Sequence, residues 1–463
     1  MDRSDWAPLT TVTDVYRFLC GLKINKSTGS DGISNFLFKI ASPYLCQPLC
    51  NIVNSSILER QVPLLFKLCD ISPIPKCYPV SEDQLRPISL LSIPSKFLEY
   101  WILKNIKQDF LRCTPPHQFA YKPKSSTTCA LITIHDAITN MLEDDALLGA
   151  AIISYDFSKA FDTLPHHVLL EKLQNLNFPT GFVLWLHDYL SERQQRVRIG
   201  DMKSDCLPVS SGVPQGSLLG PFLFVVMCHD LSAYHPSSFV AQYADDTTIV
   251  CPIKAVPDFE HKIKDEISHM KNWTTVNGFK LNTAKTKCLL LGKRSCPLVT
   301  LRDLPYQCDW MTILGVLWTP SLSWDLHFEC VEKKCSQRLY LLRVLKNVAS
   351  HDELWLIFNA VIVNVLTYAI ELFGPLSSVT RKKVQRIFKR AKRIICHRDC
   401  LCTYPNAFEE ICTKKDSETP FQSTTAGAPS LPSCATQKRS WSFFCSLFKH
   451  HTTPKLFHRV FSY

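Results

Sequence analysis

The sequence has no apolar segment at its start, because Met1 is followed by Asp2 and Arg3 rather than by the hydrophobic region of a signal peptide. Its 21 cysteines are odd in number and irregular in spacing, which is not the pattern of a disulfide framework. These two absences argue against a small secreted protein. We therefore expect reduced thiols and a nuclear or cytoplasmic location, not secretion.

Acidic residues are fewer than basic ones, with 41 Asp and Glu against 52 Lys and Arg, so the net charge is +11. A polyanion is the natural partner of such a chain. An uninterrupted membrane span is also lacking, since the apolar run at residues 354–372 contains Asn359, Asn364 and Glu371 and has no companion segment. We expect this run to be a packed helix and expect no membrane partner. The 463 residues, 46% of them hydrophobic, suit a globular protein of several domains.

Acidic residues do gather at two strand ends. Tyr243-Ala244-Asp245-Asp246 lies between two apolar runs and predicts a tight hairpin with acid at its tip. A second apolar strand, residues 151–155, ends at Asp156. Two carboxylates about 4 Å apart repel each other by about 4 kcal/mol at an effective dielectric near 20, so a cation is needed to keep both ionised. One such turn alone is also explained by solvated acids, but three carboxylates at two strand ends predict a site for two divalent metals.

Several motifs in this order resemble the palm motifs of reverse transcriptases. These are Asp156 with Phe161 five residues on, Gly212-Val213-Pro214-Gln215-Gly216-Ser217, and Tyr243-Ala244-Asp245-Asp246. The flanking residues 86–91 and 281–286 resemble non-LTR (LINE-type, jockey-like) retrotransposon polymerases in particular. The resemblance extends from about residue 25 to about residue 395. It implies an α+β right-hand polymerase fold of fingers, palm and thumb, with an antiparallel palm sheet and a helical thumb.

The domain boundaries that we expect are a truncated leader at 1–24, fingers at 25–146, a palm with the reverse transcriptase core at 147–320, a helical thumb with a basic helix at 321–400, and a partly disordered tail at 401–463. Residues 321–348 and 350–373 predict thumb helices, the second opening with Ser350 and Glu353 at capping-box spacing. Residues 313–318 resemble the primer-grip hairpin. LINE-type proteins usually carry an endonuclease before the fingers, so we expect a fragment, a truncated copy or a polymerase without its own nicking activity.

The resemblance implies that Asp156, Asp245 and Asp246 are catalytic and bind metal, with the Phe157 carbonyl as a further ligand. The implied cofactor is Mg²⁺, as two ions, with Mn²⁺ as the alternative. The implied reaction is two-metal nucleotidyl transfer, in which a primer 3′-hydroxyl is extended with dNTPs. The implied partners are an RNA template, a DNA primer and dNTPs.

Five further residues are candidates for binding the nucleotide. Lys76 offers a point charge and Arg86 a planar fork for triphosphate oxygens. Gln215 and Gly216 lie in a loop that lets the backbone approach the nucleotide closely. Lys285 is a candidate for protonating or neutralising the leaving pyrophosphate, although a plain salt bridge predicts the same residue.

Phe161 predicts a deoxynucleotide polymerase, because a planar ring beneath the sugar collides with a 2′-hydroxyl. RNA-copying RNA polymerases resemble this motif but have a hydrogen-bonding Asp at that place, and Asp162 is only one residue later, which leaves a shift of register open. Ala120 stands where the family has Gly in a Gln-Phe-Gly-Phe element. If that Gly serves a positive φ, Ala120 implies strain or a relaxed turn.

Residues 380–395 place basic side chains around an apolar stripe and predict an amphipathic helix. We expect its cations to bind a phosphate backbone, with membrane-surface binding and a solvated face as the alternatives. The candidate nucleic-acid-binding residues are Arg386, Lys389, Arg390 and Arg393. Cys396, His397, Cys400, Cys402 and Cys412 follow, but their spacing matches neither a paired Cys-x-x-Cys site nor a retroviral-type knuckle.

Two rival functions stay open at this point. A catalytically inactive retrotransposon remnant, or a domesticated nucleic-acid-binding protein, retains a basic surface but has no reason to retain the full carboxylate set. An intron maturase-like reverse transcriptase shares the palm but usually adds a maturase domain and an HNH endonuclease, and neither is found in the sequence.

Overall fold

The computed structural model describes residues 6–76, 79, 84–254, 256–292, 305–373 and 377–395. All of them belong to one unit of the chain, Met1–Cys400. The second unit, Leu401–Tyr463, lies outside the described residues. The predictions for the tail and for the cysteine cluster that begins at Cys396 fall on residues 396–463, which lie outside the described residues.

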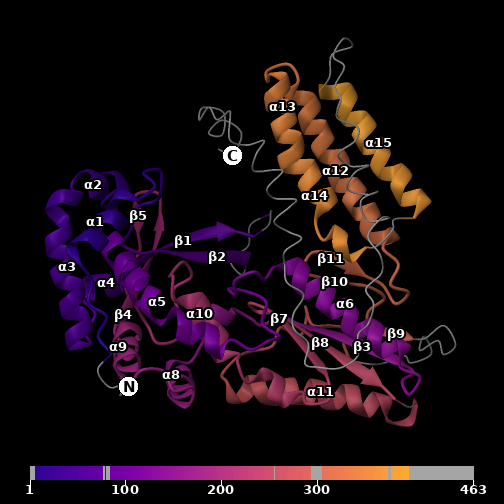
Figure 1. The fold of residues 1–463 in the computed structure, drawn as a ribbon, viewed down its shortest axis with the longest axis horizontal. Coiled ribbons are helices and arrows are strands. Elements are labelled where there is room, and N and C mark those ends of the chain that lie inside the picture. Colours follow the sequence, from indigo (N-terminus) through magenta and orange to yellow (C-terminus); the bar gives the residue numbers. More distant parts are fainter. Residues whose placement is uncertain are drawn as a thin grey trace. The chain divides into compact units, whose positions relative to one another are not determined.

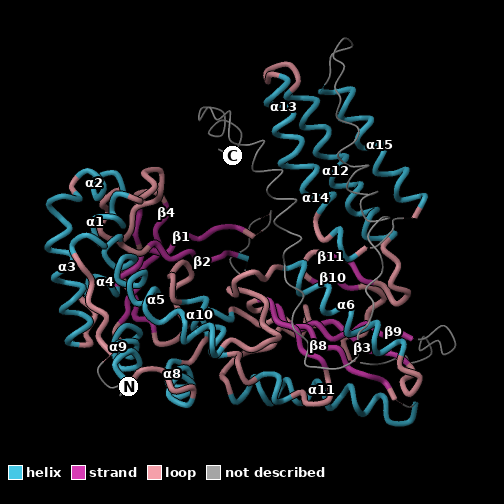
Figure 2. Tube along the Cα trace, viewed as in Figure 1, coloured by secondary structure: helices cyan, strands magenta, loops and turns pink. Residues whose placement is uncertain are grey.

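A five-stranded sheet lies among the N-terminal helices (Figures 1 and 2). Its strands run in the order β2-β1-β4-β5, with β6 paired to β4, and β1 is antiparallel to β2 but parallel to β4. The strands are β1 (Leu68–Pro75), β2 (Leu85–Leu90), β4 (Arg193–Ile199), β5 (Met202–Lys203) and β6 (Leu207–Val209). The helices are α1 (Val12–Cys20), α2 (Asn35–Ile40), α3 (Ser42–Glu59), α4 (Leu64–Lys67) and α5 (Ile93–Cys113).

A buried ion cluster joins β1 to β4. Asp70 of β1 is fully buried, and its carboxylate contacts Arg196 at 2.8 Å and Arg198 at 3.4 Å. Lys203 of β5 lies 4.0 Å from the same carboxylate. A buried carboxylate is tolerated only when it is paired in this way, so the cluster fixes which strand can lie beside β1.

The second sheet is antiparallel and has the order β7-β8-β3-β9. Its strands are β3 (Gly149–Tyr155), β7 (Phe239–Tyr243), β8 (Asp246–Ile253) and β9 (Lys287–Gly292), and the helices α6 (Thr127–Glu143) and α11 (Val256–Val276) cover its two faces (Figure 1). Ile152 packs into the core beneath α6, whereas Ile153 packs into the core that includes α11. Because successive side chains point to opposite faces, a strand covered on both sides is expected to be apolar, and the buried residues Ala150 to Ile153 of β3 are.

Helices connect the two sheets. They are α7 (Ala160–Thr163), α8 (His166–Asn175), α9 (Thr180–Leu190), α10 (Gly220–Met227) and the 3₁₀ segment η3 (Leu231–Tyr234). The strands β4 to β6 lie inside the predicted palm range but belong to the first sheet, in which β4 pairs with β1, while α6 lies inside the predicted fingers range but packs on β3. The five domain boundaries therefore stay predictions: the first sheet takes strands from both ranges, and the second sheet, whose strands all lie in the palm range, is covered by a helix from the fingers range.

The helical region begins after the hairpin of β10 (Met311–Ile313) and β11 (Val316–Trp318), at the position of the predicted primer grip. Its elements are α12 (Asp325–Leu345), α13 (His351–Phe358), the π-helix η5 (Asn359–Val363), α14 (Asn364–Thr367), the 3₁₀ segment η6 (Ile370–Leu372) and α15 (Ser378–Ile395). Helices α12, α13 and α15 lie side by side (Figure 1). The α+β right-hand architecture is confirmed.

The single helix predicted over residues 350–373 contains a π-helical stretch at Asn359–Val363 and ends at Thr367, six residues before the predicted end. The predicted capping box of Ser350 and Glu353 is present, but Arg338 donates a hydrogen bond to the Val361 carbonyl within the π-helix. The α-helix then ends at Thr367, because Tyr368 turns to donate its hydroxyl to the Leu314 carbonyl at 2.6 Å.

The segment His351–Leu372 has the length and apolar composition of a membrane span, one such segment among the described residues, which is weak evidence for a membrane. Within the helical region its buried side chains include Leu354, Phe358 and Ile362. A packed helix gives the same composition.

Candidate active site

The Asp-Asp turn is a two-residue hairpin between β7 and β8. Tyr243 pairs with Asp246, and Ala244 takes a left-handed φ of 57° to close the turn. Behind it, the buried Gln118 accepts hydrogen bonds through Oε1 from the backbone N–H of Ala244 at 3.2 Å and of Ala120 at 2.9 Å. The turn is therefore held from behind by a side chain from a distant part of the chain, which offsets the strain of Ala244.

Asp156 follows β3 at the same end of the sheet. Tyr155 pairs with Thr247 of β8, so the next residue of β3 lies beside the Asp-Asp turn. The Asp156 carboxylate accepts a hydrogen bond from Asn282 Nδ2 at 3.0 Å, and Lys285 Nζ lies 3.2 Å from the same oxygen. The structure thus brings Asp156, Asp245 and Asp246 together at the same end of the sheet's strands, with the Lys285 ammonium group in contact with Asp156.

The peptide groups around Phe157 are directed by a short ladder with residues 280–282. Asn282 N–H donates to the Asp156 carbonyl at 2.8 Å, and Ser158 N–H donates to the Lys280 carbonyl at 2.8 Å. Because directions alternate along an antiparallel strand, the Phe157 carbonyl points away from this ladder. That orientation keeps it out of the ladder and is compatible with the predicted ligand role.

Burial and the neighbouring carboxylates shift the pKa values of Asp245 and Asp246. Burial raises the pKa of Asp245, with repulsion from Asp156 as a further cause, while Arg86 and Lys285 oppose the increase. Partial desolvation, followed by repulsion from Asp245 and Asp156, raises the pKa of Asp246 to about 6, although this residue is exposed at the rim. Crowded carboxylates of this kind are stabilised in the ionised form by a bound cation.

The loop that contains Gln215 and Gly216 precedes α10 and contacts Asp162 and Ser89. Gln215 donates a side-chain hydrogen bond to Asp162 Oδ1 at 2.9 Å, and its carbonyl accepts one from Ser89 N–H at 2.8 Å. Gly216 has a φ of 128°, and a Cβ there would lie 2.8 Å from the Ser89 carbonyl. Glycine is therefore required by both the conformation and the close approach of β2.

Phe161 and Asp162 have different environments, which bears on the register left open by the sequence. The Phe161 ring stacks on Phe224 with centroids 4.7 Å apart and is partly buried against the main core. Asp162 instead holds Gln215, and burial raises the pKa of its carboxyl, against the hydrogen bond from Gln215 and the charges of Lys159 and Lys76. The two residues thus carry separate contacts, and the sugar-contact role of Phe161 stays a prediction.

Ala120 does not take the positive φ that its place in the motif suggested. The left-handed residue is its neighbour Tyr121, with a φ of 59°, and Ala120 is buried beside Gln118. Tyr121 lies close enough to Asp245 for that charge to be one cause, after burial, of its raised pKa. The expected strain therefore falls one residue later than the motif predicted.

The basic cluster lies on α15, away from the strand ends that carry the carboxylates. Arg386, Lys389, Arg390 and Arg393 are all exposed. The opposite face of the helix is buried through Val384, Ile387, Ala391, Ile394 and Ile395. The predicted amphipathic helix is present, and its role in binding stays a prediction.

Residues 74–318 match the family of reverse transcriptases (RNA-dependent DNA polymerases). The chain belongs to this family. It is 25% identical over 409 residues to the RNA-directed DNA polymerase from mobile element jockey of Drosophila melanogaster, an alignment that covers 84% of this chain and 44% of that protein. It is 27% identical over 412 residues to the probable RNA-directed DNA polymerase from transposon BS of the same organism, again with 84% and 44% covered. The predicted resemblance to non-LTR retrotransposon polymerases is confirmed, and the chain spans less than half the length of these relatives.

Among solved structures, a telomerase from Candida tropicalis in complex with a fragment of telomeric RNA is similar, with 13% identity, 89% of this chain and 79% of that chain covered, and a TM-score of 0.42. A likeness at this level adds nothing to the assignment of function.

Sequence reasoning missed three polar residues that support the candidate site. Asn282 binds Asp156, Gln118 supports the Asp-Asp turn, and Asp162 holds Gln215. Asn282 and Gln118 stand inside motifs that the resemblance covers, so their amide groups were an available signal. Asp162 was noticed only as an alternative for Phe161.

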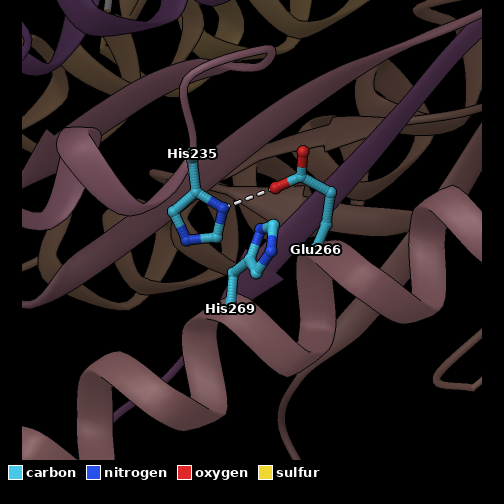
Figure 3. Close-up of side chains that lie close together, drawn as sticks. All are labelled: His235, Glu266 and His269. Carbon is cyan, nitrogen blue, oxygen red and sulfur yellow. Dashed lines mark hydrogen bonds and ion pairs between the residues drawn. The ribbon is translucent and has the colours of Figure 1, made fainter.

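A cluster of His235, Glu266 and His269 lies at η3 and α11 (Figure 3). These groups could hold a metal ion, but Nδ1 of His235 lies 2.5 Å from Glu266 Oε2, and Ser238 donates to Glu266 Oε1 at 2.6 Å. Both carboxylate oxygens of Glu266 are thus already engaged by His235 and Ser238, and His235 and Glu266 are buried whereas His269 is exposed. We interpret the cluster as a buried hydrogen-bonded pair beside an exposed histidine.

Proposed function

We propose that the chain is the RNA-directed DNA polymerase part of a non-LTR retrotransposon protein, an enzyme that extends a primer 3′-hydroxyl with dNTPs on an RNA template. The observation that carries this proposal is the convergence of Asp156, Asp245 and Asp246 at one edge of the antiparallel sheet. Burial first, and then repulsion between the carboxylates, raises the pKa values of Asp245 and Asp246, and raised carboxyl pKa values are a feature that functional sites share. Lys285 and Arg86 add the positive charge that a triphosphate requires.

The donor set fits divalent metal ions. Carboxylate and carbonyl oxygens are the ligands that Mg²⁺ and Mn²⁺ prefer, and Asp156, Asp245, Asp246 and the Phe157 carbonyl would supply them. Two such ions, when bound, stabilise charge on the attacking and leaving oxygens of phosphoryl transfer. Asn282 orients Asp156 through the hydrogen bond at 3.0 Å, and Gln118 fixes the turn that carries Asp245.

The surrounding residues place the nucleotide and balance its charge. Arg86 presents a planar fork next to Asp245, and Lys76 a point charge near Asp162, for triphosphate oxygens. Lys285 is exposed and bound to Asp156, so it can swing to neutralise or protonate the leaving pyrophosphate. Gln215 and Gly216 let the backbone approach the nucleotide, and Phe161 closes the space beneath its sugar against a 2′-hydroxyl.

The exposed cations of α15 contact the primer-template in this proposal. Arg386, Lys389, Arg390 and Arg393 present four positive charges on one solvent-facing side. Such contacts provide affinity without sequence information. We also propose a nuclear or cytoplasmic location, which fits the observation that no disulfide joins the cysteines of the described residues.

Metal-dependent primer extension on a homopolymer RNA template tests the proposal. Purified chain is incubated with a labelled DNA primer, dNTPs and Mg²⁺ or Mn²⁺, with Asp245→Asn as the inactive control. We expect extension by the wild type only, and its loss on chelation. Tight primer-template binding by the wild type without any extension would instead support a nucleic-acid-binding remnant.

A further inference from the structure

A fully buried glutamate lies behind the loop that contains Gln215 and Gly216. Glu99 of α5 has no exposed surface, and its two carboxylate oxygens accept separate hydrogen bonds. Leu218 N–H donates to Oε2 at 2.6 Å, and the Tyr189 hydroxyl donates to Oε1 at 2.6 Å. An ionisable group is rarely buried without a partner, so both bonds are needed to keep Glu99 in this place.

Leu218 ends the loop that Gln215 and Gly216 form. The front of this loop is held by Ser89 and Asp162, through the bonds to the Gln215 carbonyl and side chain. The C-terminal part of the loop leads into α10, and the first N–H of this helix, from Gly220, donates to Ser217 Oγ at 2.8 Å. The Glu99 bond holds the Leu218 N–H, so the loop is anchored on both sides of Gly216.

The support behind Glu99 is itself rigid. Tyr189 is buried and stacks on Trp185 with centroids 5.3 Å apart. The guanidinium of the buried Arg193 lies 4.7 Å from the centre of the Tyr189 ring and donates to the Tyr189 carbonyl at 3.1 Å. Burial raises the pKa of Glu99, while the bonds from Tyr189 and Leu218 and the charges of Arg193 and Lys96 act in the opposite direction.

We propose that Glu99 is a positioning residue for the incoming nucleotide, which acts by fixing the backbone of Gln215 and Gly216 through the Leu218 N–H. This inference rests on the proposed polymerase function. Glu99 touches neither nucleotide nor metal in this account. Its replacement should therefore weaken dNTP binding more than it slows chemistry.

Two substitutions at the same position separate positioning from packing. In Glu99→Gln the amide oxygen can accept from Leu218 N–H while the amide nitrogen donates to the Tyr189 oxygen, so the anchor survives. In Glu99→Leu both hydrogen bonds are removed at similar volume. We expect KM for dNTP to rise about tenfold in Glu99→Leu, with kcat changed by less than about threefold, and to stay within about threefold of wild type in Glu99→Gln. The measurement is single-nucleotide extension on a fixed primer-template.

Two controls complete the experiment. Tyr189→Phe removes one bond to Glu99 but leaves the bond to Leu218, so KM should change little. Asp230→Asn disturbs a separate, partly buried network, in which Asp230 accepts from Lys172 at 2.7 Å and from Trp273 at 2.9 Å. It should lower Tm without raising KM. If Glu99→Leu lowers Tm in the same way and leaves KM unchanged, Glu99 is only structural and the inference is wrong.

Hydrogen exchange separates this inference from the proposed function. The amide of Leu218 should be protected in the wild type and in Glu99→Gln but exchange faster in Glu99→Leu, while the amides of β3 keep their protection. Absence of extension by the wild type would refute the polymerase function. The amide result still stands in that case, and retained protection of Leu218 in Glu99→Leu would overturn the anchoring role.

Discussion

Charged side chains are concentrated in two places, at one end of the strands of the β7-β8-β3-β9 sheet and on the helix α15. The two places differ in how buried these side chains are and in what fixes them. At the strand ends, Asp156 and Asp245 are partly buried. Asn282 and Lys285 bind the Asp156 carboxylate, and Gln118 supports the turn that carries Asp245. On α15 the cations Arg386, Lys389, Arg390 and Arg393 project into solvent from a helix whose other face is buried.

This contrast determines what each kind of charge can do. Carboxylates held at fixed positions in partly desolvated surroundings interact strongly, so removing one changes the whole set. Exposed cations on a helix act almost independently, and salt screens each of them. We therefore expect all-or-none effects at the sheet edge and graded effects on α15.

The largest effect is expected for Asp156→Asn or Asp245→Asn. Either change removes a metal ligand and should reduce primer extension by roughly 10³-fold or more. Primer-template binding should stay within a few-fold of the wild type, because cations elsewhere provide that affinity. Extension rates and filter-binding affinities are measured on the same preparations. Extension at a near wild-type rate in either variant would remove the carboxylates from the active site.

The next effect concerns the choice of sugar. Phe161→Val or Phe161→Ala should open space for a 2′-hydroxyl and lower the ratio of kcat/KM for dNTP over rNTP by about tenfold to a hundredfold, since each 1.36 kcal/mol is about tenfold in rate. Phe178→Val is a matched control, because Phe178 packs in the same core against Phe110 and Phe182. A ratio that stays constant in the Phe161 variants would make Phe161 a core residue only.

A graded effect is expected on α15. Replacing Arg386, Lys389, Arg390 and Arg393 with Gln should weaken primer-template binding. It should also reduce the slope of log K against log salt by about 0.7 to 0.9 for each phosphate that the helix no longer neutralises. The double variant with Lys264→Gln and Lys271→Gln on α11 is the control, because it removes two exposed lysines from a helix outside the proposed binding surface. An unchanged slope in the α15 variant would mean that these cations only face solvent and do not bind the primer-template.

The smallest effect is on stability without metal. The raised pKa of Asp246, about 6, means that the folded state binds this proton more tightly than the unfolded state does. Ionisation of Asp246 therefore costs stability as pH rises from about 4 to about 6. Asp246→Asn should raise Tm in the presence of a chelator at pH 8, by on the order of 1 °C, with the difference shrinking as pH falls below 6. A lower Tm for the variant at pH 8 would contradict the crowding of these carboxylates.

Local patterns in the sequence were sufficient to predict that Asp156 and the Asp-Asp turn lie at the same end of the sheet. The apolar runs before Asp156 and on both sides of Asp245 predict strands, and acids at strand ends predict a shared edge once the strands pair. The amphipathic spacing of α15 and the capping box at Ser350 are equally local, and both are present.

Contacts between distant segments could not be predicted in the same way. The parallel pairing of β1 with β4 and the bond from Glu99 to Leu218 depend on tertiary packing, to which no spacing in the sequence corresponds. The break after Thr367 arises because Tyr368 binds Leu314 on another element. Tertiary contacts of this kind override a helical pattern.

The buried Asp70 also has a consequence for the order of events during synthesis on the ribosome. Its partner Arg196 is 126 residues further along the chain, so the N-terminal sheet cannot be completed until β4 has emerged. Until then β1 has an unpaired edge and an acid that cannot be buried without its arginines, which would cost about 3 to 5 kcal/mol. A nascent or truncated chain that ends between residues 146 and 193 should therefore be recognised by chaperones or aggregate, rather than fold into a separate fingers domain.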